Sequence, residues 1–276
     1  MPENCGGSCM SPDHQPQILW QAHPSIGPNQ LRVTTLIHDK PRLHPEVQAA
    51  IEEKAASKKI ARNGTLASLV EFESSATGLH ITTGLTNYVT QVGINANYQD
   101  PRISRHPDSL RHGSLVLSAL VISSDGFIVL GNRPMGKDHT IPGIIGGTAN
   151  RDEKTGPLTE GVHYFNLINS EVEEELGVHP DETLTALLAL LINPLSGRPL
   201  LLFLSKSSLS KSQVSQRFSE GGNKAEHESL YFLPADIDSV KAFLKQHPSD
   251  LSTTLATIDA LSFYLLHYEQ IRQAAI

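Results

Sequence analysis

Cysteine is scarce in this 276-residue chain, and its two cysteines, Cys5 and Cys9, both lie near the N-terminus. Two thiolates without a neighbouring histidine or a second cysteine pair cannot complete the tetrahedral shell of a structural zinc site. We therefore expect a reduced, intracellular chain in which these two thiols have no structural or metal-binding role.

Basic residues and long apolar runs are also lacking. Lysine and arginine number 22 against 29 acidic residues, which gives a net charge of -7. This balance argues against stable binding to nucleic acid, although a bound divalent cation could still attract a small anionic substrate. Because no apolar run reaches the roughly 20 residues that cross a bilayer, and the N-terminal tail lacks an apolar signal segment, we expect a cytoplasmic protein without membrane contact.

The composition of the N-terminal part predicts an arm followed by a small lobe. Residues 1–30 are rich in Pro, Gly, Ser, Asn and Gln without periodicity, which favours a flexible or loosely docked arm. In the lobe predicted over 31–110, helical spacing indicates a helix at 45–59, and two short strands at 65–73 and 79–85 could form a hairpin. The boundary near 110 follows from a stretch dense in Pro, Arg and His.

The main domain predicted over 111–276 begins with two apolar runs on either side of Asp125-Gly126, a strong hairpin signal. A further strand is expected at 139–147 and ends in Gly146-Gly147, and a helix is expected over about 159–176, ended by Gly177. The remaining predicted elements are strands at 183–192, 198–205 and 230–234, a helix at 210–220 and one long amphipathic helix at 251–273.

The predicted helix ends in the acidic segment SEVEEELGV, residues 170–178. At about 100° per residue, Glu171, Glu174 and Glu175 share an arc of roughly 100°, and Glu173 points away from them. An apolar stripe for the core is expected beside these carboxylates, formed by Phe165, Ile168, Val172 and Leu176. Such a run is typical of a solvated helix face, but here it follows a hairpin and a strand that ends in two glycines. Three neighbouring carboxylates repel one another unless a cation lies between them, which predicts a magnesium site with manganese as the alternative ion.

These residues resemble the signature of the Nudix hydrolases, in which a glycine and a spaced glutamate precede Arg-Glu-apolar-x-Glu-Glu-x-Gly-apolar. The second half matches at Glu171, Val172, Glu174, Glu175, Gly177 and Val178. The first half departs from the signature: Ser170 stands at the arginine position, the spacing from Gly146 or Gly147 is longer, and the earlier glutamate falls near His163, with Glu160 as a nearby substitute. In the family, that arginine orients a metal-binding glutamate.

A wider resemblance, from about residue 33 to 233, is to the animal UDP-glucose pyrophosphatase subfamily, which also has a stretched signature without arginine. The matching landmarks are TGLTNYVTQVGIN at 83–95, SALVISSDGFIVL at 118–130 and RFSEGGNKAEHES at 217–229. The resemblance implies an α+β fold, namely a Nudix-type α/β/α sandwich with a mixed sheet plus a smaller N-terminal α/β lobe. It also implies magnesium-dependent hydrolysis of UDP-glucose or UDP-galactose to UMP and the sugar 1-phosphate.

Further candidate residues lie outside the acidic helix. Glu226, His227 and Glu228 occupy a glycine-rich loop where many Nudix enzymes keep another glutamate, and Glu228, nearest the next strand, is our first choice as general base. Arg133 is expected to contact the phosphates, and Gly146 and Gly147 are expected to bind the substrate. In the landmark at 83–95, Asn87, Tyr88 and Asn95 are expected to bind uracil by hydrogen bonding and stacking.

Two other hypotheses remain open at this point. The chain is either a Nudix enzyme for another substrate, such as ADP-ribose, a nucleotide cofactor or a dinucleoside polyphosphate, or a Nudix-fold binding module without turnover. Ser170 and the missing first glutamate favour a module without turnover, whereas the presence of Glu171, Glu174 and Glu175 opposes it.

Overall fold

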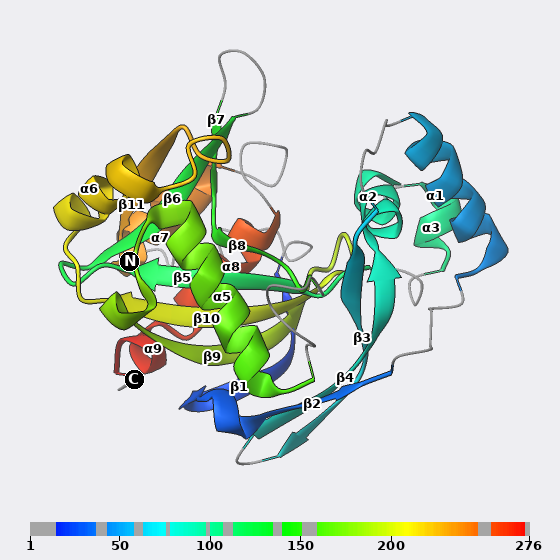
Figure 1. Cartoon of the computed structure of the whole chain (residues 1–276), viewed down its shortest axis with the longest axis horizontal. Coiled ribbons are helices and arrows are strands. Elements are labelled where there is room, and N and C mark those ends of the chain that lie inside the picture. Colours follow the sequence, from blue (N-terminus) through cyan, green and yellow to red (C-terminus); the bar gives the residue numbers. More distant parts are fainter. Residues whose placement is uncertain are drawn as a thin grey trace, which may run out of the picture.

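The computed structural model describes residues 15–36, 43–57, 63–75, 78–97, 100–106, 113–134, 140–150, 159–247 and 255–273. Its centre is an eight-stranded mixed sheet (Figure 1). The main strand order is β1 (Gln17–Ile26), β9 (Thr183–Ile192), β10 (Pro199–Ser207), β5 (Val116–Ile122), β6 (Phe127–Pro134) and β11 (Ser229–Pro234). The short strands β7 (Thr140–Gly143) and β8 (Ile145–Thr148) pair with β6 and β5. Only β5 and β10 pair in parallel among these neighbours, so the sheet is mixed and the predicted α+β class is confirmed.

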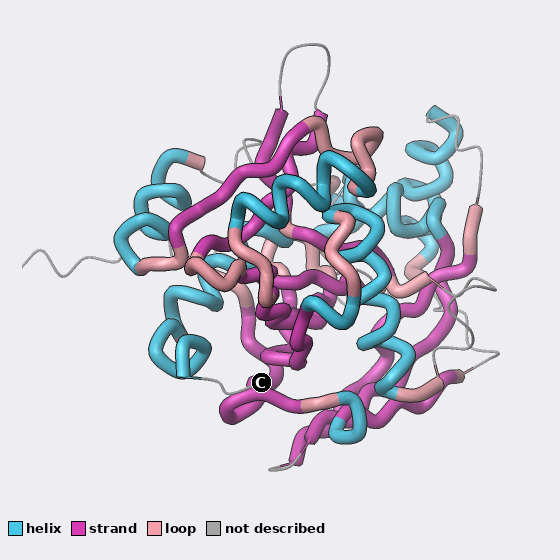
Figure 2. Tube along the Cα trace, turned by 60° about the vertical axis from the view of Figure 1, so that its left-hand side comes forward, coloured by secondary structure: helices cyan, strands magenta, loops and turns pink. Residues whose placement is uncertain are grey.

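Helices cover both faces of this sheet because its central strands are apolar on both sides. In β5, Leu117, Ala119 and Val121 belong to the core cluster that includes α5 (Gly161–Leu176) and α6 (Lys211–Gly221), whereas Leu120 belongs to the opposite cluster. That second cluster includes α7 (Ile237–Gln246) and α8 (Leu255–Leu266). Figure 2 shows the helices on either side of the strands. The arrangement is therefore a three-layer α/β/α sandwich.

A second, three-stranded sheet has the order β2 (Leu31–Thr35), β4 (Gly78–Asn87) and β3 (Thr65–Ser75). Beside it lie α1 (Pro45–Ser57), α2 (Tyr88–Asn97) and α3 (Pro101–Ser104), which share a small apolar core (Figure 1). The antiparallel pairing of β3 with β4 confirms the predicted hairpin, and α1 confirms the predicted helix. Ala67 of β3 hydrogen-bonds through its backbone to Ala149 and Leu115, which joins the small sheet to the large one.

The predicted arm over 1–30 is wrong for residues 17–30, since β1 pairs with β9 at the edge of the large sheet and is followed by a short 3-10 helix, Pro28–Gln30. Trp20, Ala22 and Ile26 are buried there. A register shift between Gln21 and Ile26 interrupts the pairing, and an edge strand tolerates such an irregularity. The first 14 residues, including both cysteines, lie outside the described residues.

Two other predicted elements are divided in the structure. The strand expected at 139–147 is interrupted at Ile144, whose backbone N–H donates to Thr257 Oγ1 at 2.8 Å, which separates β7 from β8. The long C-terminal helix expected at 251–273 is broken at His267 into α8 and α9 (Tyr268–Gln273). In addition, α8 is buried over most of its surface and is not amphipathic. None of the described helices is long and apolar enough to span a bilayer.

Candidate active site

The acidic residues lie on α5, which packs across the sheet and ends where Gly177 adopts a left-handed φ of 71°. The apolar stripe predicted for this helix is confirmed, since Phe165, Ile168, Val172 and Leu176 are all buried in the core. The neighbouring stripe brings Glu171 and Glu175 against β8. Packing of the apolar stripe therefore determines where these carboxylates lie.

Glu175 is 1% exposed and has three partners. Its Oε1 accepts a hydrogen bond from the backbone N–H of Gly146 at 3.3 Å and lies 3.6 Å from Nη2 of Arg133. Its Oε2 lies 2.7 Å from Nε2 of His227. Burial raises the pKa of Glu175 to about 8, and burial together with Arg133 lowers the pKa of His227 to about 4. The imidazole is therefore neutral at physiological pH, and one hydrogen bond joins its Nε2 to the carboxyl group of Glu175.

Glu171 lies one helical turn before Glu175 and directly over Gly147. A Cβ on Gly147 would lie 2.5 Å from Oε1 of Glu171, so a side chain at that position would displace the carboxylate. The adjacent Gly146 has a φ of 140°, and a Cβ there would collide with the backbone oxygen of Leu117. Burial, followed by the charges of Glu175 and Glu174, raises the pKa of Glu171 to about 7. Gly147 is thus required by the close approach of α5 to β8, and Gly146 by its positive φ and by the neighbouring backbone of β5.

Arg133, near the end of β6, connects this helix with the loop before β11. Its Nη2 lies 3.2 Å from Oε1 of Glu226 as well as 3.6 Å from Glu175. Its Nε has no hydrogen-bond partner among the described residues. The absence of a side chain at Gly143 makes room for the guanidinium, since a Cβ there would lie 2.9 Å from Nε.

The donor set around Glu175 fits a divalent cation. Ligand atoms of Glu175, Glu226 and His227 all lie within 4.8 Å of one another. The charges of Glu174 and Glu226 further raise the pKa of both Glu171 and Glu175, which shows that their carboxylates repel one another in the metal-free protein. Carboxylate oxygens are the ligands that magnesium and manganese prefer.

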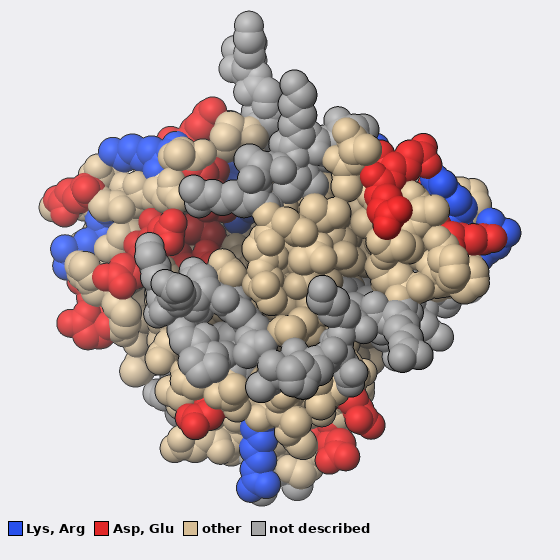
Figure 3. All heavy atoms as spheres, turned by 45° about the vertical axis from the view of Figure 1, so that its right-hand side comes forward, with Lys and Arg blue, Asp and Glu red and all other residues tan. Residues whose placement is uncertain are grey.

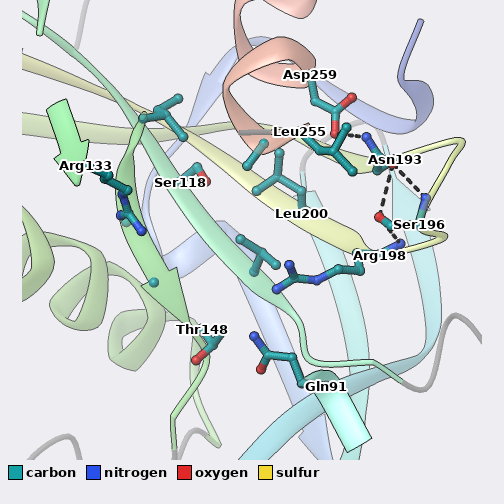
Figure 4. A pocket seen from close by; sticks show the side chains of 15 residues that line it. Gln91, Ser118, Arg133, Thr148, Asn193, Ser196, Arg198, Leu200, Leu255 and Asp259 are labelled. Atoms are coloured by element: carbon teal, nitrogen blue, oxygen red, sulfur yellow. Dashed lines mark hydrogen bonds between the residues drawn. The ribbon is translucent and has the colours of Figure 1, made fainter. Parts of the chain in front are cut away.

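A cavity of about 340 Å³ lies next to these carboxylates, between β5, β8 and the N-terminal end of α8 (Figure 4). Arg133, Gly146 and Gly147, all predicted to contact substrate, line the cavity. Its other lining residues are Gln91, Val116, Ser118, Ile144, Thr148, Asn193, Ser196, Arg198, Leu200, Leu255, Ala256 and Asp259. The cavity is therefore polar at its ends and aliphatic along its walls, as is common in sites for small organic ligands.

On the face drawn in Figure 3, lysine and arginine side chains are scattered among acidic ones, and the described residues of this view form no continuous basic surface. The cationic groups at the site are instead Arg133 and Arg198, which line the cavity. Positive charge is thus placed where a small anionic ligand could reach it.

No protein-family model matches this chain, and no curated protein sequence matches it. Several solved structures are similar to it, among them a MutT NUDIX hydrolase from Burkholderia pseudomallei with 19% identity over 45% of this chain and 84% of that one, at a TM-score of 0.29. A NUDIX hydrolase from Nitrosomonas europaea has 13% identity over 57% of this chain and 90% of that one, with a TM-score of 0.35. A MutT protein from Methanosarcina mazei has 13% identity over 58% and 96%, with a TM-score of 0.33. These scores are too low to support an argument about this chain.

Not every predicted acidic residue lies next to Glu175. Glu174 is exposed on the outer side of the stripe, and Glu173 points elsewhere, with its Oε1 2.8 Å from Nδ1 of His179. In the loop before β11, the structure brings Glu226 and His227 to Glu175, whereas Glu228 is exposed and its backbone N–H donates to the oxygen of Asn132. Ser170, at the position of the family arginine, is exposed.

Of the residues expected to bind uracil, Asn87 and Tyr88 do not line the cavity. Asn87 precedes α2 and its Oδ1 accepts from the N–H of Thr90, while its side chain faces a separate hollow beside α1. Tyr88 is 43% exposed. Asn95 is part of α2, and its side chain lies outside the described part of the molecule. From this helix it is Gln91 that reaches the cavity.

Sequence reasoning missed Gln91, Asn193, Arg198 and Asp259. Two of them had a signal in the sequence, because Arg198 is a lone charge between apolar runs and Asp259 is the one acidic residue of an otherwise apolar helix. Asp259 is 1% exposed, and burial raises its pKa to about 7 even though its Oδ2 accepts from Asn193 at 2.8 Å. Gln91 had no such signal beyond its place in the landmark at 83–95.

Proposed function

We propose that this chain is a metal-dependent hydrolase that cleaves the pyrophosphate bond of a nucleoside diphosphate derivative, with a UDP-sugar as the favoured substrate. The observation that supports it best is the position of Glu171 and Glu175, side by side against Gly146-Gly147 at the edge of a ligand-sized cavity. The choice of a UDP-sugar rests on the resemblance of the landmarks at 83–95, 118–130 and 217–229.

The metal would be held by Glu171 and Glu175, the two carboxylates against Gly146-Gly147, with Glu174 contributing negative charge from the solvent side. A bound Mg²⁺ or Mn²⁺ supplies charge neutralisation for the phosphate oxygens and lowers the pKa of bound water. The two raised carboxyl pKa values support this assignment, because a cation removes the repulsion that causes part of the shift.

Arg133 is suited to bind phosphate. A guanidinium offers several donors in one plane, and its Nε lacks a partner in the described part of the chain while Nη2 lies near Glu175 and Glu226. A phosphate oxygen next to the carboxylate-bound metal would lie within reach of these remaining donors. Its role is to orient the pyrophosphate and to offset the charge that develops on it.

Ser170 does not argue for an inactive protein. The family arginine orients a metal-binding glutamate, and here Glu175 is contacted from two other elements, by Arg133 of β6 and by His227 before β11. These partners fix both carboxylate oxygens, so the orientation that the arginine would provide is present without it. This supports an enzyme over a binding module without turnover.

Glu226 is the better placed base of the two loop glutamates. Its carboxylate lies within the cluster around Glu175, whereas Glu228 is exposed. A general base must reach the attacking water directly or through one further water. Glu226 is therefore assigned this role in the proposal, with Glu228 as the second choice.

The proposal is tested by incubating the pure protein with magnesium and a panel of UDP-sugars, other nucleotide sugars, ADP-ribose and dinucleoside polyphosphates. Products are separated by anion-exchange chromatography. Formation of UMP and sugar 1-phosphate from UDP-glucose or UDP-galactose, faster than any other cleavage, is expected. Faster cleavage of ADP-ribose or a dinucleoside polyphosphate would show that a UDP-sugar is not the favoured substrate. Binding of these nucleotides without any cleavage would show that the protein is a binding module and not an enzyme.

A further inference from the structure

The end of the cavity away from Arg133 contains two side chains from distant parts of the chain. Gln91 comes from α2, beside the small sheet, and Arg198 comes from the turn that leads into β10. In Figure 4 both side chains extend into the cavity and toward each other, across from Thr148. This end of the cavity is therefore formed jointly by α2 and by the turn before β10.

Both side chains have hydrogen-bonding capacity that the described protein does not use. Gln91 is 8% exposed, yet its Oε1 has no hydrogen-bond partner among the described residues. Arg198 is half-buried, and within the same part of the chain its Nε has no partner and its side chain forms one hydrogen bond, from Nη2 to Ser114 Oγ at 3.5 Å. It forms no ion pair with any described residue. Buried polar groups in proteins are nearly always paired, so these two indicate a ligand.

The turn that holds Arg198 is itself rigidly hydrogen-bonded. The Oδ1 of Asn193 accepts from the N–H of Leu195, the N–H of Ser196 and the hydroxyl of Ser196 at 2.8 to 3.0 Å. Its Nδ2 donates to the buried carboxyl of Asp259. Figure 4 shows this network behind Arg198. Arg198 is thus presented to the cavity by a preorganised turn, as expected of a binding residue.

We propose that Gln91 and Arg198 bind the pyrimidine base of the nucleotide whose pyrophosphate lies at Glu171 and Glu175. The inference rests on the proposed function and deepens it, because it assigns the base to residues that sequence reasoning did not select. The ring would lie between the aliphatic walls formed by Val116, Leu200 and Leu255.

The hydrogen-bonding groups favour a pyrimidine over a purine. A carboxamide offers one acceptor and one donor side by side, and a guanidinium offers donors only. The edge of uracil presents carbonyl, N–H and carbonyl in order, so Gln91 pairs with the N–H and one carbonyl while Arg198 donates to the other. Cytosine keeps the second carbonyl, and a rotated amide of Gln91 fits its remaining edge. Along the same edge adenine has a C–H at one end and an amino group at the other, so it offers Arg198 no acceptor. Guanine can offer its carbonyl to Arg198, but its ring N–H and amino group then both face Gln91, which has a single acceptor.

The test compares the wild type with Gln91→Leu, Gln91→Glu and Arg198→Met, and uses Gln48→Leu as the matched control. Gln48 is an exposed glutamine on α1, and among the described residues its side chain bonds only to Glu52 of its own helix. Gln91→Glu keeps the shape of the side chain but loses its donor, so it distinguishes lost recognition from lost packing. Thermal unfolding of each variant reports on its fold.

Two readouts are measured: the Kd of UMP by calorimetry in the absence of metal, and kcat/KM for UDP-glucose and ADP-glucose with magnesium. We expect each variant at Gln91 or Arg198 to weaken UMP binding roughly 10- to 100-fold. The variants should lower kcat/KM for UDP-glucose to a similar extent, mainly by raising KM. They should change kcat/KM for ADP-glucose by less than about 3-fold. Gln48→Leu should match the wild type in both.

UMP affinity that is unchanged in folded Gln91→Glu and Arg198→Met, or an equal loss for UDP-glucose and ADP-glucose, would overturn the inference. The binding readout also separates it from the proposed function. If UMP binding depends on Gln91 but the protein hydrolyses no nucleotide, the proposed base site is supported and the proposed enzymatic function is contradicted. If UDP-glucose is hydrolysed at a rate that does not depend on Gln91 or Arg198, the enzymatic function is supported and the base site is contradicted.

Discussion

Nε2 of His227 lies 2.7 Å from Oε2 of Glu175, and the two side chains are 0% and 1% exposed. They are 52 residues apart in the chain and meet because β11 pairs antiparallel with β6, next to α5. A buried carboxylate needs a partner for each oxygen, and His227 provides one while Gly146 and Arg133 provide the other. His227 is therefore a positioning residue for the proposed metal ligand.

His227→Leu should leave Oε2 of Glu175 buried and unpaired. Loss of such a supporting contact commonly lowers metal affinity or activity about 10- to 100-fold. We expect a rise of this size in the magnesium concentration that gives half-maximal activity, with His227→Gln, which keeps a donor, restoring much of the affinity. Equal magnesium requirements in the wild type and His227→Leu would show that the imidazole does not position Glu175.

Removal of metal should abolish turnover reversibly. Dialysis against a chelator is expected to reduce activity to background, and magnesium or manganese should restore it. Added metal should also raise the Tm, because it binds the folded chain and relieves repulsion between Glu171, Glu175 and Glu226. Both effects are measured on one metal-free preparation, and full activity after exhaustive dialysis would contradict the proposal.

The stability of the metal-free protein should fall as the pH rises. The folded-state pKa values of Glu171 and Glu175 are raised to about 7 and about 8, so the folded chain binds more protons than the unfolded chain above pH 4.5. Their favourable contribution is present below pH 4.5 and is lost as the pH rises through 7 and 8. Urea unfolding in the presence of a chelator at several pH values measures how the free energy of unfolding decreases with pH, and Glu171→Gln should make this decrease smaller. If the decrease is the same in Glu171→Gln, the carboxyl of Glu171 does not titrate as stated.

The two loop glutamates should differ in their effect on the rate. Glu226→Gln removes a carboxylate next to Arg133 and Glu175, and loss of a general base typically costs 10²- to 10⁴-fold. Glu228→Gln changes an exposed side chain and should have the smaller effect. The kcat values with saturating magnesium decide between them, and a larger loss for Glu228→Gln would move the base to that residue.

The sequence predicted those features that depend on local pattern. The 3.6-residue spacing of Phe165, Ile168 and Val172 identified the helix face that packs on the sheet, and Gly177 identified the end of the helix. The same pattern correctly separated Glu173 from Glu171 and Glu175. Spacing within one helix is a short-range property, and a single sequence contains it fully.

Features that depend on strand pairing were not predictable in this way. The contact of His227 with Glu175 requires the register of β11 against β6, and the meeting of Gln91 with Arg198 requires the small sheet to lie against the end of the large one. β1 was missed because its polar and irregular segment reads as an arm until β9 is available as a partner. In each case the deciding partner is far away in the chain.

The central claim, that Glu175 on α5 serves metal-dependent pyrophosphate cleavage, is tested most directly by UMP release from UDP-glucose with magnesium. The wild type, Glu175→Gln and the matched control Glu173→Gln are assayed in parallel, since Glu173 lies on the same helix but contacts His179. The proposal predicts equal amounts of UMP and glucose 1-phosphate from the wild type and Glu173→Gln at similar rates. It predicts a rate at least roughly 100-fold lower for folded Glu175→Gln, since a metal ligand is lost. Equal rates for both variants, or no UMP from any of the three proteins, would contradict it.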